Sequence, residues 1–183
     1  MLATAAELLE ERGYPAFTVD EVARRSGASK ATIYKHWTGG FDLAVEAYGV
    51  KVTGFAGPID TGDVRADLTV QILLLAALYA SRQGHIVAQL LAGAAGDTER
   101  AELVRRKFFG ERRNDTAALI DRAKADGRLR PDVDTQLCID MLFGPIVFRL
   151  VNGMKPIGPD DARELARMSL RAILPSRDAT TES

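Results

Sequence analysis

The sequence contains one cysteine, two histidines and no long apolar run, and each shortage excludes a class of protein. Cys138 alone cannot form an internal disulfide framework or a cluster of thiolate metal ligands, so we expect it to be a small core residue. The longest apolar stretch, residues 70–80, is well short of the ~20 residues that cross a bilayer, and the first residues do not form a basic leader. These absences predict a cytoplasmic protein without membrane association.

An excess of positive charge is also absent, because 24 Lys and Arg residues face 25 Asp and Glu residues. Contact with nucleic acid would therefore depend on local segregation of charge. Residues 24–41 supply such a segment, which contains no Asp or Glu and holds Arg24, Arg25, Lys30, Lys35 and His36. Cationic and hydroxyl donors without carboxylates favour a surface for a phosphate backbone.

Patterns that carry catalysis are missing as well. The sequence has no nucleophile elbow, no phosphate-cradling glycine-rich loop after a strand, and no metal-spaced set of His or Cys. Only His36 and His85 offer imidazoles, and Asp132 and Asp134 are interpreted as part of a turn and helix cap. We predict that the protein is not an enzyme and holds no metal or cofactor.

The N-terminal region predicts three short helices. Apolar spacing indicates a first helix over residues 1–12, and Thr18 with Glu21 forms a capping box for a second. Gly27 suits the positive φ of a tight turn, and Ser29 caps a third helix. In a helix-turn-helix, the third helix returns one apolar residue to the core, here Ile33, and its remaining side chains are free to enter a major groove.

Residues 16–37, AFTVDEVARRSGASKATIYKHW, and ERGY at 11–14 resemble the DNA-binding signature of the TetR (tetracycline repressor) family. The resemblance runs from Leu2 to about Ala47. It implies an all-α fold of about nine helices, in which a three-helix helix-turn-helix domain precedes a larger helical ligand-binding and dimerisation domain. The exposed polar positions predict DNA contacts at Thr18, Lys30, Thr32, Tyr34, Lys35 and His36.

Two departures from the family pattern bear on affinity. A basic arm usually precedes the first helix, whereas residue 1 already adjoins that helix, and Gly40 stands where the fourth helix commonly begins with Lys. Each lost phosphate contact would lower the log–log salt slope by about one. An all-α ligand-binding dimer with weak or lost DNA binding is therefore the alternative. The DNA-targeting half of a recombinase is disfavoured because spaced carboxylates for two metals are absent.

Glycine and proline divide the chain. We expect a DNA-binding domain over residues 1–53, a punctuating segment at 54–62, a ligand-binding and dimerisation domain over 63–175 and a disordered polar tail at 176–183. Apolar spacing predicts further helices over residues 41–53, from 63 to about 79, and over 85–92, 98–126, 134–152 and 159–174. Basic residues at 105–113 alternate with acidic ones and are interpreted as a solvated, ion-paired face.

The larger domain offers a candidate ligand cavity, because a pocket needs a few polar groups among apolar ones. We assign to it Gln71, Tyr79, His85, Gln89 and Phe109. Each polar residue of this set is also compatible with a satisfied or surface position. The expected effector is a small apolar or amphipathic molecule.

The segment 134–152 carries apolar residues on more than one face, which requires covering from its own domain or from a partner subunit. Residues 127–134 and 144–151 also resemble the C-terminal half of TetR-like regulators, in which the last two long helices pair with their twins. The dimer interface is assigned to Phe143, Val147, Val151, Leu165, Ser169 and Ile173. The combined prediction is a homodimeric, ligand-responsive regulator, in particular a repressor, on a palindromic double-stranded DNA operator.

Overall fold

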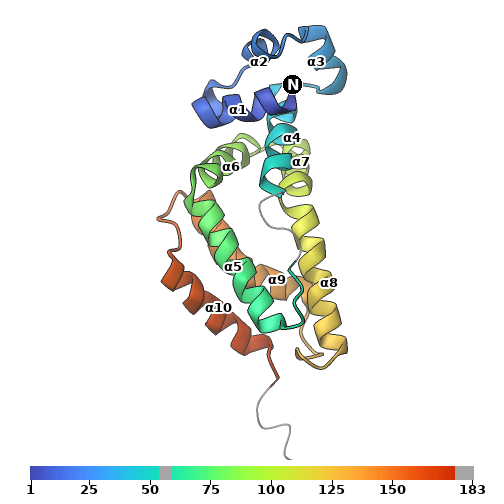
Figure 1. Ribbon diagram of the computed structural model, residues 1–183, viewed down its shortest axis with the longest axis vertical. Coiled ribbons are helices and arrows are strands. Elements are labelled where there is room, and N and C mark those ends of the chain that lie inside the picture. The colour runs from blue at the N-terminus through green and yellow to red at the C-terminus, as the bar shows by residue number, and fades with distance from the viewer. Residues whose placement is uncertain (54–58, 176–183) are drawn as a thin grey trace, which may run out of the picture. The chain divides into compact units, whose positions relative to one another are not determined.

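The computed structural model describes residues 1–53 and 59–175, in which every regular element is a helix (Figure 1). Part of the predicted punctuating segment, 54–58, and the predicted tail, 176–183, lie outside the described residues. The α-helices are α1 (Leu2–Arg12), α2 (Val19–Ser26), α3 (Lys30–His36), α4 (Gly40–Thr53), α5 (Val64–Ala80), α6 (Arg82–Gly93), α7 (Thr98–Val104), α8 (Glu111–Ala125), α9 (Thr135–Val151) and α10 (Pro159–Ile173).

A π-helical segment at Arg105–Gly110 joins α7 to α8 without a break. The sequence prediction of one long helix over 98–126 is thereby confirmed. With this stretch taken as one helix, the described part of the chain forms nine, which confirms the predicted all-α fold. Among the same residues no single helix is long and apolar enough to cross a membrane, whereas α5 and α6 taken as a bent pair meet that test of length and composition.

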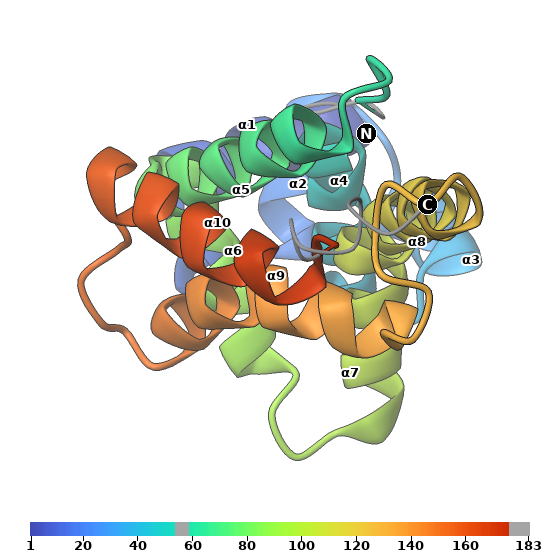
Figure 2. The same ribbon diagram turned by 90° about the horizontal axis from the view of Figure 1, so that it is seen from below.

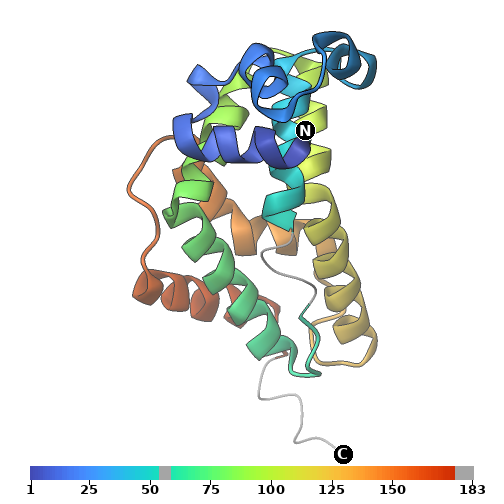
Figure 3. The same ribbon diagram turned by 45° about the horizontal axis from the view of Figure 1, so that its top comes forward.

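One compact unit contains α1 to α4 and residues 81–111. Within it α1 crosses α4 (Figure 3), and the buried side chains of both helices form its core. The Arg82 guanidinium donates to the main-chain oxygen of Glu10 (2.6 Å) in the last turn of α1, and the Gln89 side chain accepts from the Tyr14 amide (2.8 Å). Residues 81–111, which follow the boundary expected from the sequence, thus pack with the N-terminal helices.

The second compact unit contains α5, α9, α10 and α8 from Arg112 onward. Helices α5 and α10 lie side by side, and α9 packs against both (Figure 2). The fully covered side chains of Leu68, Ile72 and Leu142 belong to this core. Asp67 is also buried, and its carboxylate accepts from the amide (3.0 Å) and the hydroxyl (2.6 Å) of Thr61, so that each of its two oxygens has a local hydrogen-bond partner.

Candidate nucleic-acid interface

Local side-chain chemistry fixes the turn between α2 and α3. The Thr18 hydroxyl accepts from the Glu21 amide (3.2 Å) at the start of α2, and the Ser29 hydroxyl accepts from the Thr32 amide (3.0 Å) at the start of α3. Gly27 ends α2 with φ of 72°, in the left-handed region that favours glycine. The structure therefore confirms the two predicted N-caps and the predicted turn residue.

Helix α3 has seven residues and a single buried side chain, Ile33, which has no exposed surface. Helices shorter than about 12 residues are marginal on their own in water, so α3 depends on its anchors. Besides Ile33, the Trp37 indole N–H donates to the Glu46 carboxylate (3.2 Å) on α4 just beyond the end of α3. These contacts hold α3 while most of its surface remains open.

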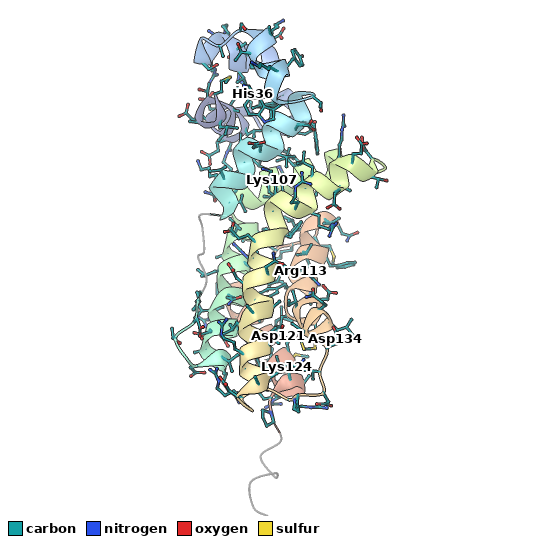
Figure 4. The ribbon with its side chains drawn as sticks, turned by 90° about the vertical axis from the view of Figure 1, so that its right-hand side faces the viewer. His36, Lys107, Arg113, Asp121, Lys124 and Asp134 are labelled. Carbon is teal, nitrogen blue, oxygen red and sulfur yellow. The ribbon has the colours of Figure 1, made fainter. Side chains whose placement is uncertain are left out.

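All six residues predicted to contact DNA are exposed: Thr18, Lys30, Thr32, Tyr34, Lys35 and His36. Five come from α3, and Thr18 comes from the N-terminus of α2. Figure 4 labels His36 at the end of α3. The structure thus brings the predicted set onto the helix-turn-helix and leaves each member accessible.

Lys30 forms an ion pair that the sequence analysis missed. Its ammonium lies 2.7 Å from the Asp20 carboxylate on α2, and this hydrogen bond raises the pKa of Lys30. Both side chains are more than half exposed, and exposed pairs are typically worth about 0–1 kcal/mol. Lys30 can therefore exchange Asp20 for a nucleic-acid acceptor at little cost.

Glu21 forms ion pairs with both arginines of α2. Its carboxylate accepts from Arg24 and from Arg25, each at 2.8 Å, and Arg25 also donates to Glu11 (2.7 Å). The hydrogen bonds from Arg24 and Arg25 lower the pKa of Glu21 to about 2. The two arginines open the carboxylate-free segment of the sequence, yet carboxylates outside that segment neutralise them. By contrast, Lys35 makes no ion pair with the described residues.

A cation–π contact and a hydrogen bond join the helix-turn-helix region to α7 and α6, respectively. The Tyr14 ring meets the Phe41 ring edge-on at 5.7 Å, and the Arg100 guanidinium lies 4.9 Å from the centre of the Phe41 ring. The side chain of Gln89, which the sequence assigns to the ligand cavity, accepts from the Tyr14 amide in the structure. Residues 81–111 therefore support the N-terminal helices directly.

The other predicted ligand residues fall into both compact units. His85 is exposed, and Phe109 is half-buried beside an open groove of about 660 Å³ at the turn between α6 and α7. In the second unit, the Gln71 side chain accepts from the Thr116 hydroxyl (2.9 Å), and burial raises the pKa of Tyr79 to about 12. No single compact unit contains all five residues.

The six residues predicted for the dimer interface differ in exposure. Within their own unit Phe143, Ser169 and Ile173 are buried, Val147 and Leu165 are half-buried, and Val151 is exposed. The large apolar side chains that α9 and α10 expose, besides Val151, are Leu137, Met141, Phe148 and Met168. The sequence placed apolar residues on these helices but did not identify which face they leave uncovered.

Comparisons with known proteins cover nearly the whole chain. The family described as "Bacterial regulatory proteins, tetR family" matches residues 1–46, and "Tetracyclin repressor-like, C-terminal domain" matches residues 58–168. The uncharacterized HTH-type transcriptional regulator YdeS of Bacillus subtilis (strain 168) is 31% identical over 173 residues, which are 94% of this chain and 87% of YdeS. The DNA-binding transcriptional repressor TetR of Mycobacteroides abscessus is 28% identical over 169 residues, covering 92% and 87% of the two chains.

Among solved structures, the crystal structure of the TetR family transcription regulator SCO0332 is similar, with a TM-score of 0.82 and 33% sequence identity. The alignment covers 95% of this chain and 96% of that one. The likeness therefore extends through both compact units and is not confined to the helix-turn-helix.

Glu21 makes the stability of the N-terminal unit depend on pH. Its pKa in the folded protein, about 2, is below the ordinary value of 4.5, so its contribution is complete above about pH 4.5 and is lost as the pH falls toward 2. We expect urea unfolding to show wild type more stable than Glu21→Gln at neutral pH, with the difference shrinking across that window.

The matched control is Glu7→Gln, because Glu7 is exposed on α1 and makes no ion pair with the described residues. This substitution should leave the pH profile unchanged. A constant difference between wild type and Glu21→Gln from pH 5 to pH 2 would contradict the assignment.

Proposed function

Because the chain belongs to the TetR family and is a helix-turn-helix transcriptional regulator, we propose that it acts as a ligand-responsive homodimeric repressor. The observation that carries the proposal is the exposure of α3. It presents all five of its predicted contact residues to solvent and is anchored through one buried side chain, Ile33. A short helix held in this way is suited to enter a major groove.

On the operator, Lys30, Thr32 and Tyr34 contact base edges, and Lys35 and His36 contact phosphates. Thr18 adds a phosphate contact through its hydroxyl at the N-terminus of α2, where the helix dipole favours an anion. Two copies related by a twofold axis read an inverted repeat whose half-sites lie about one helical turn, roughly 34 Å, or a multiple of it apart.

The dimer forms through α9 and α10. Leu137, Met141, Phe148 and Val151 follow one another on α9 at spacings of 4, 7 and 3 residues, which places them within about 80° of the helix circumference. Their exposed fractions are 68%, 36%, 60% and 57%. Exposed apolar surface of this kind marks an interaction site, and a second copy is the partner that a palindromic operator requires. The half-buried Val147 and Leu165 complete this interface at its edges.

Ligand response requires a connection between the second unit and the DNA-binding helices. The chain supplies one, because α6 follows α5 directly and the π-helical segment runs into α8. α6 holds α1 and the Tyr14 amide through Arg82 and Gln89. The effector must bind the arrangement that cannot bind DNA more tightly than the one that can. A preference of about 5.5 kcal/mol would shift the ratio of DNA-binding to non-binding protein from 99:1 to 1:99.

The second candidate function is a ligand-binding dimer with weak or lost DNA binding. It is favoured by the neutralisation of Arg24 and Arg25 and by Gly40 at the start of α4, which together leave few free cations near α3. Sequence preference in DNA binding separates the two functions, since a vestigial domain would retain at most a weak affinity for any duplex.

Alanine substitutions on α3 test the operator contacts. We expect Lys30→Ala to weaken binding to fragments selected from random duplex DNA by about 1–3 kcal/mol, with little loss on unselected DNA. Lys35→Ala should weaken binding to both and lower the salt slope by about one for each subunit. Fluorescence anisotropy at several salt concentrations measures both effects.

Lys51→Ala serves as the control, because Lys51 lies at the end of α4 in an ion pair with Glu10. Equal losses for Lys30→Ala on selected and unselected DNA would identify Lys30 as a phosphate contact. Failure of wild type to enrich any sequence would favour the second candidate function.

A charge on the exposed face of α9 tests the dimer. Phe148→Asp should leave the helical circular dichroism unchanged, because Phe148 is 60% exposed, and should weaken the dimer at least roughly a hundred-fold in sedimentation equilibrium. Two buried carboxylates would face each other across the symmetric interface. Met154→Asp, beyond the end of α9, is the control, and a Phe148→Asp protein that stays dimeric would contradict the proposed face.

A further inference from the structure

Arg112 departs from the solvated, ion-paired face that the sequence predicted for residues 105–113. Arg105 pairs with Glu102, and the Arg113 guanidinium donates to Asp140 (2.7 Å) and to Gln136 (2.9 Å) between α8 and α9 (Figure 4). Arg112 is half-buried, and its guanidinium makes no ion pair or hydrogen bond with the residues that the structure describes. It is therefore a charge partly removed from water without a protein partner.

Such a charge is costly. A guanidinium remains protonated at physiological pH and carries five N–H donors, so burial cannot be relieved by loss of the proton. Burial lowers the pKa of Arg112, which is the expected direction for a desolvated cation. Buried charges are normally paired, and an anion bound at Arg112 would remove the penalty.

The neighbouring polar groups lie on the facing side of α5. One turn after Arg112, the buried Thr116 hydroxyl donates to Gln71 on α5 (2.9 Å). Tyr79, two turns further along α5, is 6% exposed. Burial raises the pKa of the Tyr79 hydroxyl, and the positive charge of Arg112 partly offsets this by lowering it. Between them Leu75 contributes buried apolar surface to the same face of α5.

Helix geometry gives the position of Arg112 along the common direction of α5 and α8, here called its level. Helices α5 and α8 run in opposite directions (Figure 1), and each residue advances about 1.5 Å along its helix. Arg112 is about 6 Å from the level of Thr116 and Gln71, and Tyr79 is about 12 Å beyond Gln71. Arg112 therefore lies between the levels of Gln71 and Tyr79. The backbone of α5 packs closely against those of α9 and α10, whereas it makes few close approaches to the backbone of α8.

We propose that Arg112 binds the carboxylate head group of an otherwise apolar effector in the second unit, with the Tyr79 hydroxyl as an additional donor. The inference rests on the ligand response proposed above and specifies its chemistry. A single guanidinium matches a singly charged carboxylate in charge and, through two parallel N–H donors, in geometry. The buried Leu75 provides an apolar neighbour for the chain of the ligand.

The position of Arg112 also connects this site to the DNA-binding helices through the chain. Arg112 follows the π-helical segment Arg105–Gly110 by two residues, and π-helical turns are frequent at functional sites. That segment contacts α4, where the Lys107 ammonium lies 3.9 Å from the Glu46 carboxylate. Glu46 in turn accepts from Trp37 at the end of α3. Anion binding at the first turn of α8 would thus act on a continuous helix that reaches α4.

Thermal unfolding of Arg112→Met and of the neighbouring control Arg113→Met tests the site, with sodium octanoate, decanoate and dodecanoate as anionic probes and 1-decanol as the uncharged probe. Without a probe, Arg112→Met should raise the Tm, because it removes an unpaired desolvated charge, while Arg113→Met should lower it or leave it unchanged. The carboxylates should raise the Tm of wild type and Arg113→Met, with affinity reduced roughly ten-fold or more in Arg112→Met. The change in Tm caused by 1-decanol should be the same in wild type and in Arg112→Met.

Three results would overturn the proposal: a lower Tm for probe-free Arg112→Met, equal carboxylate shifts in the two variants, or no shift of wild type by any of the three carboxylates. Binding of the same proteins to selected DNA is measured in parallel, and decanoate should release wild type but not Arg112→Met. Absence of DNA binding by probe-free wild type would contradict the proposed regulator while leaving the thermal result on Arg112 intact, so the two failures are distinguishable.

Discussion

One buried side chain, Ile33, ties the seven-residue helix α3 to the rest of the protein. A helix of this length gains too few internal hydrogen bonds to persist alone, so tertiary contact decides whether it forms. The cap from Ser29 and the indole hydrogen bond from Trp37 to Glu46 fix its two ends. Since Ile33 and these two end contacts hold α3, its remaining side chains are available for recognition, and the proposed function follows from that division.

Charge around α3 is arranged so that few cations act freely. Glu21 and Glu11 occupy Arg24 and Arg25, and Asp20 holds Lys30 in an exposed pair. This arrangement limits attraction to any duplex, because nonspecific affinity grows with the number of phosphates neutralised. Under the proposed function, binding would then depend more on whether the groove offers Lys30 a better acceptor than Asp20. In the second unit, by contrast with these paired cations, Arg112 is partly removed from water and has no partner among the described residues.

Much of the N-terminal region could be predicted from its sequence, because its determinants are local. Thr18, Gly27 and Ser29 act on residues within one turn of themselves, and the structure places each as expected. Contacts between distant residues could not be predicted in this way: Arg25 meets Glu11 from 14 positions away, and Gln89 reaches Tyr14 from 75. The same limit explains Arg112, because charge alternation along one helix does not show which arginine faces α5. For the residues predicted to form the dimer interface, apolar periodicity identified α9 and α10 but not the face that these helices leave uncovered.

A hydroxyl-radical footprint of the purified protein, on a duplex that it enriches from random DNA, would show directly whether two α3 helices bind together. We expect two protected patches with inverted sequence, related by a twofold axis and separated by about one helical turn, roughly 10 base pairs, or a multiple of it. A single asymmetric patch, or protection that does not depend on sequence, would contradict the claim that paired α3 helices read an operator.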